Sequence, residues 1–198
     1  MARELPAEVK EKFQDYREEY RELIEGMNSR QEGLYSALIF LVKFSLLAAP
    51  FYIVLGTGWE LEGLRAWNAH ASAYILEIIG IDASSTGSFV LTGDMVLDVT
   101  WDSTAWKSAA VFIGLILASP GRLGAKMKGI LLGIPILLGV NLLRISSMVY
   151  AVRVLGLDYE FIHTFLWRWG LTVAVLASWL LWWYRTDISR RIRKIGRL

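Results

Sequence analysis

The chain has 198 residues, 55% of them hydrophobic, with nine tryptophans and a net charge of +2. Its mean hydropathy of +0.41 is too high for a soluble domain of this length, so the composition indicates a polytopic helical membrane protein. The chain has no cysteine and only two histidines, which excludes disulfides and thiolate metal sites and leaves us expecting no metal or other cofactor, and nothing in it predicts nucleic-acid binding.

The first segment is charged and amphipathic. Residues 5–28 place apolar side chains at nearly regular spacings of four and three from Val9 to Met27, and Pro6 suits a first helical turn. So narrow a stripe suits packing on another helix or on a membrane surface. We therefore expect residues 1–33 to form a cytoplasmic amphipathic helix without chemistry, and no signal peptide.

A first spanning helix is predicted at residues 34–55. Residues 60–80 instead combine one apolar helical face with several charged side chains, which favours an interfacial or re-entrant helix. Residues 82–101 are rich in turn formers and contain an alternating stretch. They predict a small extracytoplasmic β-hairpin or structured loop, with its tip at residues 92–94.

Three further spanning helices are predicted, at 104–119, from Met127 onward, and at 163–184, which makes about four in all. The second of these carries Gly129 and Gly133 in a G-x-x-x-G arrangement that permits close helix packing. The fold class is therefore an all-α polytopic membrane protein with added interfacial elements.

Arg144 lies deep in an apolar run, with Asn141 three residues earlier on the same helical face. A charge in hydrocarbon costs from about 2.5 to more than 10 kcal/mol, so an intramembrane arginine is a candidate functional residue. A structural arginine that ties helices together is the alternative. Asn141 can hydrogen-bond within the bundle.

Basic residues predict the orientation of the chain. The loop 121–128 has three basic residues and no acid, and the tail 185–198 has six basic residues and one acid. The positive-inside rule places both segments in the cytoplasm, with both termini. We therefore expect a membrane catalytic domain at 34–184, a basic cytoplasmic tail at 185–198, and an extracytoplasmic site where Ser103, Arg144 and His163 converge.

Acyl transfer needs a nucleophile, a proton acceptor and a donor for the developing oxyanion. Arg144 cannot be the base, because a guanidinium does not deprotonate in proteins, but it can lower a thiol pKa or hold a substrate carbonyl. His163 suits base and acid duty, with an interfacial helix cap as the alternative.

Two charged neighbours are expected to support the site. Lys107 could form a dyad with Ser103, although pairing with lipid headgroups or with Asp102 is the simpler account. Asp102 either orients His163 or caps the helix that begins at Thr104, and capping is favoured. A substrate groove is expected to include Thr104, Trp106 and Arg168.

Three motifs together carry a resemblance to a known family. They are W-D-S-T-A-W-K-S at 101–108, N-L-L-R-I at 141–145, and His163. In this order and spacing the chain resembles a compact member of the archaeosortase/exosortase family, over about residues 98–169. That family has a catalytic cysteine where this chain has Ser103. The serine is either a natural variant or a replacement that inactivates the enzyme.

The resemblance implies a membrane transpeptidase with Ser103, Arg144 and His163 as catalytic residues. It implies substrates that are secreted or membrane-anchored proteins with C-terminal transmembrane sorting signals, and a membrane lipid as acceptor. A groove open to lipid is then expected between the helices that carry Ser103 and Arg144. Two other classes stay open: an intramembrane serine hydrolase that releases free product, and a non-enzymatic membrane scaffold.

Overall fold

The computed structural model describes residues 14, 15, 18, 26–58, 60–93, 95–160, 162 and 169–195, with side chains as far as 186. The chain divides into two compact units, Met1–Lys43 and Phe44–Leu198. Most of the predicted N-terminal helix, together with His163 and Arg168, lies outside the described residues. The domain boundaries expected at 33 and 184 stay predictions.

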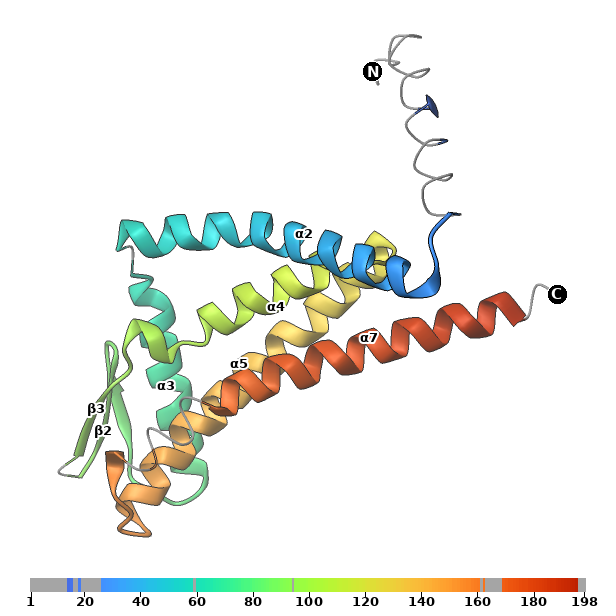
Figure 1. The fold of residues 1–198 in the computed structure, drawn as a ribbon. Coiled ribbons are helices and arrows are strands. Elements are labelled where there is room, and N and C mark those ends of the chain that lie inside the picture. The colour runs from blue at the N-terminus through green and yellow to red at the C-terminus, as the bar shows by residue number, and fades with distance from the viewer. Residues whose placement is uncertain are drawn as a thin grey trace, which may run out of the picture. The chain divides into compact units, whose positions relative to one another are not determined.

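The described part of the chain is mostly helical, with one small sheet (Figure 1). Its main helices are α2 (Ser29–Thr57), α3 (Glu62–Ile78), α4 (Trp106–Ala118), α5 (Leu123–Arg153) and α7 (Leu171–Ile195). Within the described residues, α2 and α5 are long and apolar enough to cross a membrane, and α4 is a shorter apolar helix. The 13 residues of α4 extend about 20 Å, which covers only part of a hydrocarbon core of about 30 Å.

The sheet has three antiparallel strands in the order β1 (Ser84–Thr86), β2 (Phe89–Thr92) and β3 (Met95–Asp98). The predicted hairpin is confirmed, since Thr92 pairs with Met95 and Gly93 has a φ of 56° in the turn. The prediction missed β1, because Ser-Ser-Thr shows no apolar alternation. That strand forms by pairing with β2, an interaction that its own sequence does not encode.

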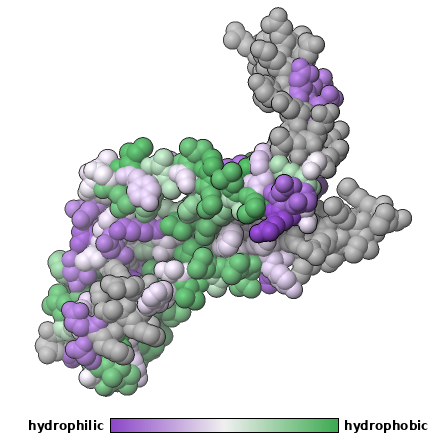
Figure 2. Space-filling model, in the orientation of Figure 1, coloured by the Kyte–Doolittle hydropathy of each residue, from purple (hydrophilic) through white to green (hydrophobic). Residues whose placement is uncertain are grey.

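The helix predicted at 60–80 is α3, and its buried face consists of small and polar residues. Asn68, Ala69, Ser72, Ala73 and Leu76 are buried, and the core that they help to form includes residues of the sheet and of α5. The expected apolar face is instead largely exposed, as is the surface of the long apolar helices, much of it green in Figure 2. Small side chains allow two helices to approach closely, which leaves the bulky ones of α3 outside.

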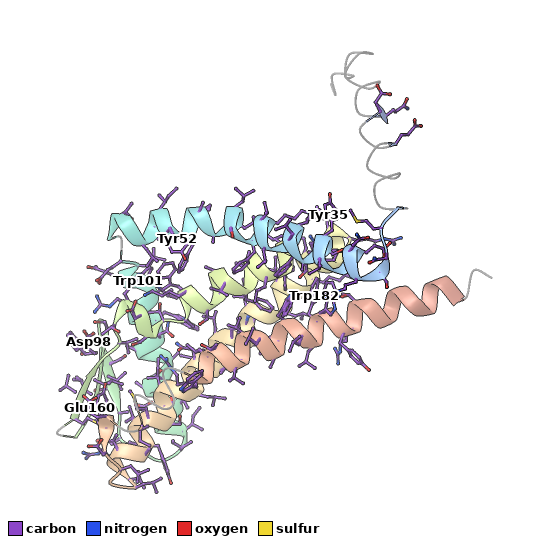
Figure 3. All side chains as sticks on the ribbon, in the orientation of Figure 1. Tyr35, Tyr52, Asp98, Trp101, Glu160 and Trp182 are labelled. Carbon is purple, nitrogen blue, oxygen red and sulfur yellow. The ribbon has the colours of Figure 1, made fainter. Side chains whose placement is uncertain are left out.

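Glycines allow α4, α5 and α7 to pack closely, as the G-x-x-x-G arrangement predicted. A Cβ atom at Gly133 would collide with the ring of Phe112 in α4, and one at Gly129 would collide with Trp182 in α7. The indole of Trp182 donates to the carbonyl of Ala125 at 3.1 Å. Figure 3 shows this contact region of α7 well separated from Trp101, which precedes α4.

Arg65 ties α3 to the segment that leads out of the sheet. Its Nε donates to the carbonyl of Val99 at 3.0 Å, and its guanidinium pairs with Glu60 at 2.7 Å and Asp98 at 3.1 Å. Three acceptors in different directions suit the planar fork of arginine and not the single ammonium of lysine. The clamp therefore fixes where the chain enters the 3-10 turn η1 (Trp101–Ser103).

Removal of this clamp should loosen the segment before η1. We expect Arg65→Ala to lower the free energy of unfolding by about 1–2 kcal/mol, and Arg65→Lys to recover less than half of that loss. Thermal unfolding of the purified protein in detergent, compared with the exposed-site control Glu62→Ala, measures the difference. Equal unfolding midpoints for Arg65→Ala and the unchanged chain would contradict the clamp.

Candidate functional site

Ser103 lies at the end of η1, between the sheet and α4, and only 6% of it is exposed. Its hydroxyl shares a hydrogen bond of 2.8 Å with the hydroxyl of Thr100, the residue before the turn. Thr104 is fully buried and donates from its hydroxyl to the carbonyl of Trp101 at 2.9 Å. The local polar bonds therefore hold the turn in a compact shape that keeps Ser103 inside.

A left-handed residue separates this turn from α4. Ala105 has a φ of 61°, a conformation that residues other than glycine rarely adopt, and it occupies the N-cap position of the helix. The helix consequently begins at Trp106, two residues later than the predicted start at Thr104. Ser103 therefore lies before the helix, and it does not share a helical face with Lys107, as a dyad of the two residues would require.

The two charged neighbours of Ser103 bind each other. Lys107 Nζ and Asp102 Oδ1 are 2.6 Å apart, and both side chains are exposed. Within the residues that the structure describes, no side chain caps α4, whose N-cap is Ala105, so the favoured prediction that Asp102 caps the helix is wrong. The alternative pairing of Lys107 with Asp102 is confirmed, and the ammonium of Lys107 is engaged with this carboxylate.

Asn141 and Arg144 both reach Ser103 from α5, through its backbone carbonyl. Asn141 Nδ2 donates to this oxygen at 2.8 Å, and Arg144 Nη2 donates to it at 3.2 Å. All three residues are buried. The structure thus brings together Ser103, Asn141 and Arg144, while His163 lies outside the described residues.

This arrangement places a permanent cation and an amide donor beside residue 103. A cation near a cysteine at this position would lower its thiol pKa below the ordinary value of about 8.5. A serine hydroxyl is not ionised in that way and depends on a general base. A cation beside residue 103 therefore favours ionisation of a thiol at this position and has no such effect on a serine hydroxyl.

Asn68 of α3 belongs to the same polar network, and the sequence analysis did not single it out. Its Oδ1 accepts a hydrogen bond of 3.0 Å from Asn141, and its own Nδ2 donates to the carbonyl of Leu64 at 2.8 Å. Asn68 is fully buried. A signal was available, since an asparagine beside Ala69 and one turn before Ser72 marks a small polar face of the helix.

A cavity of about 390 Å³ lies between the second half of α2 and α4, with Trp101 and Trp106 in its wall. Trp101 stacks on Trp106 with ring centroids 4.6 Å apart, and Phe51 packs on Trp106 at 5.1 Å. The rest of the lining is also apolar: Phe44, Leu47, Ala48, Pro50, Val54, Leu61, Ala110, Val111, Ile113, Gly114 and Leu117.

This cavity is distinct from the expected groove. A groove was expected between the helices that carry Ser103 and Arg144, and it stays a prediction. At Gly133, which precedes Arg144 in α5, the two helices are tightly packed, because α5 meets the ring of Phe112 there. The cavity lies on the other side of α4. Trp106 lines this cavity and Thr104 does not. The substrate groove with Thr104, Trp106 and Arg168 stays a prediction.

Comparison with known proteins gives one family. Residues 32–183, which are 152 of the 198 residues, match the family model described as transmembrane exosortase (Exosortase_EpsH). No curated protein and no solved structure matches the chain. The family match extends well beyond the three motifs and includes α2, α3 and the sheet.

Proposed function

This chain belongs to the transmembrane exosortase family, and from this premise we propose that it cleaves C-terminal sorting signals of secreted proteins and passes the new C-terminus to a membrane lipid. The family consists of cysteine-type sorting transpeptidases of the membrane, whose substrates carry C-terminal sorting signals. The observation that carries the proposal is the convergence of Asn141 and Arg144 on Ser103. The proposed site faces the extracytoplasmic side, as the basic loop and tail predict.

The proposed reaction has two acyl transfers. The side chain of residue 103 attacks the scissile carbonyl carbon, its proton passes to His163, and Arg144 stabilises the negative oxygen that forms. The amide C–N bond then breaks as His163 returns the proton to the leaving amine. A nucleophilic group of the acceptor lipid next attacks the acyl carbon and loses its proton to His163; the acyl bond to residue 103 breaks, and the released side chain takes that proton back from His163.

The cavity beside Trp101 and Trp106 suits a small apolar part of a substrate or lipid. One turn of a helix with its side chains occupies roughly 400–600 Å³, given a diameter of 10–12 Å and a pitch of 5.4 Å. A cavity of about 390 Å³ therefore cannot hold a transmembrane helix. The helix of the sorting signal then lies outside it, and the cavity takes single side chains or one lipid chain.

The decisive experiment compares the unchanged chain with its Ser103→Cys form in liposomes that contain a membrane-anchored candidate substrate. We expect the Ser103→Cys form to cleave at least about tenfold faster, because a thiolate beside Arg144 is the stronger nucleophile. Intact-mass spectrometry of the substrate C-terminus measures cleavage, and added lipid mass identifies transfer. The matched control is Ser108→Cys, which places a thiol elsewhere in the same motif.

Each outcome of this experiment has a distinct meaning. Cleavage with a free carboxylate product would replace transpeptidation by hydrolysis, and equal cleavage by the unchanged chain would make it a serine enzyme. Cleavage by neither form, with a substrate from the same source, would contradict the proposal and favour a membrane scaffold.

A further inference from the structure

A buried hydrogen-bond chain runs from α3 to the candidate nucleophile. It begins at the carbonyl of Leu64, passes through the side chains of Asn68 and Asn141, and ends at the carbonyl of Ser103. Both asparagines are fully buried. A buried amide without a partner costs about 1–3 kcal/mol, so these hydrogen bonds favour the one arrangement of α3, α5 and the turn in which both amides have hydrogen-bond partners.

The orientation of the Asn141 amide depends on this chain. Both hydrogens of its Nδ2 are used, one on Asn68 Oδ1 and one on the carbonyl of Ser103. Its Oδ1 is buried and has no hydrogen-bond partner among the described residues. The observed orientation of the Asn141 amide is therefore favoured over the exchanged one because its nitrogen, and not its oxygen, faces the two acceptors on Asn68 and Ser103.

Asn68 supplies one of those two acceptors. With Asn68 present, an amide turned by half a rotation would set its oxygen against two acceptors; without Asn68, only the carbonyl of Ser103 opposes that turn. After such a turn, the carbonyl of Ser103 would keep only the donor from Arg144. The backbone of residue 103 would lose its closest bond to α5, which is the 2.8 Å bond from Asn141.

We infer that Asn68 is a positioning residue for the nucleophile: it orients the Asn141 amide, and through it the backbone of residue 103 next to Arg144. The inference rests on the proposed function for its meaning in catalysis. It assigns a role in the site to α3, a helix whose sequence predicts only attachment to the interface.

The test is a double-mutant cycle in the Ser103→Cys form, with Asn68→Leu, Asn141→Leu and both together. We expect Asn68→Leu to lower kcat about tenfold with KM unchanged, and the double variant to match Asn141→Leu alone within about twofold, because Asn68 acts only through Asn141. The matched control is Ser72→Ala, one turn further along the same face of α3, which removes a buried side-chain oxygen that has no hydrogen-bond partner in the described part of the chain.

A second readout needs no substrate. The chain has no cysteine of its own, so Ser103→Cys supplies its only thiol, and the pH dependence of alkylation gives the thiol pKa. Among the described residues, charged groups on the neighbouring segments are Arg144 of α5, the Asp102–Lys107 pair and the Arg65–Asp98 pair. We expect Asn68→Leu and Asn141→Leu to raise this pKa equally towards its ordinary value, and Ser72→Ala to leave it unchanged.

The two readouts separate this inference from the proposed function. A shared thiol pKa change with no cleavage in any form would uphold the role of Asn68 and defeat the transpeptidase proposal. Additive effects of the two asparagine variants, or an unchanged thiol pKa in Asn68→Leu, would overturn the inference. If Asn68→Leu does not fold, as judged by its thermal unfolding, Asn68→Ala takes its place in the cycle.

Discussion

Replacing Arg144 by alanine in the Ser103→Cys form should lower the rate of substrate cleavage by about 10²–10³-fold, the usual loss on removal of one oxyanion donor. The guanidinium lies beside residue 103, the proposed nucleophile, 3.2 Å from its carbonyl oxygen, in a buried site where electrostatic interactions are strong. The rate is measured by mass spectrometry of the substrate in liposomes.

Lysine and a second arginine provide the controls for this prediction. Arg144→Lys keeps the charge but lacks the planar fork, so its rate should lie between those of Arg144 and the alanine variant. Arg153→Ala removes another arginine of α5, outside the network around Ser103, and should keep most of the activity. If Arg144→Ala instead fails to assemble in the membrane, Arg144 is structural and the scaffold alternative gains support.

The second large effect is expected where α4 and α5 meet. Gly133→Leu should destabilise the protein by about 3 kcal/mol, because its side chain would enter the space of the buried Phe112 ring. A lower midpoint of thermal unfolding in detergent measures this loss. The packing that sets α5 against α4 also sets Arg144 against Ser103, so cleavage by the Ser103→Cys form should fall with it.

Another glycine of the same helix gives a matched control. Gly139 also lies in α5, six residues further along, but a Cβ atom there would meet nothing within 4 Å. Gly139→Leu therefore adds the same side chain to the same helix without a collision. Equal unfolding midpoints for the two leucine variants would show that close approach at Gly133 does not limit the packing.

The sequence predicted the features that depend on local pattern. Apolar length predicted helices at the positions of α2, α4 and α5 and the first part of α7, which continues past the predicted end at 184 to Ile195. Alternation with a Gly-Asp turn predicted the β2–β3 hairpin. The spacing of Asn141 and Arg144 on one helical face predicted that both would reach the same side. The family resemblance, drawn from three motifs, is confirmed by the match over residues 32–183.

Features that depend on tertiary contacts were beyond such patterns. The order Ser-Ser-Thr does not predict β1. No pattern around Asn68 predicts its hydrogen bond with Asn141, which is 73 residues away. The cavity between α2 and α4, and the close approach of α5 to α4 at Gly133, depend on distances between helices that no periodicity encodes. The catalytic roles of Ser103, Arg144 and His163 stay predictions.

The left-handed conformation of Ala105 has a consequence for what the carbonyl of Ser103 can bind. If Ala105 were right-handed, the helix could begin earlier, and this carbonyl could accept from the backbone N–H of Lys107 as in any helix. The left-handed turn costs about 1–2 kcal/mol and leaves the oxygen to Asn141 and Arg144. The shape of the segment around residue 103 therefore depends on α5. Without the bonds from that helix, nothing would offset the strain at Ala105, and a longer α4 would compete with the observed turn.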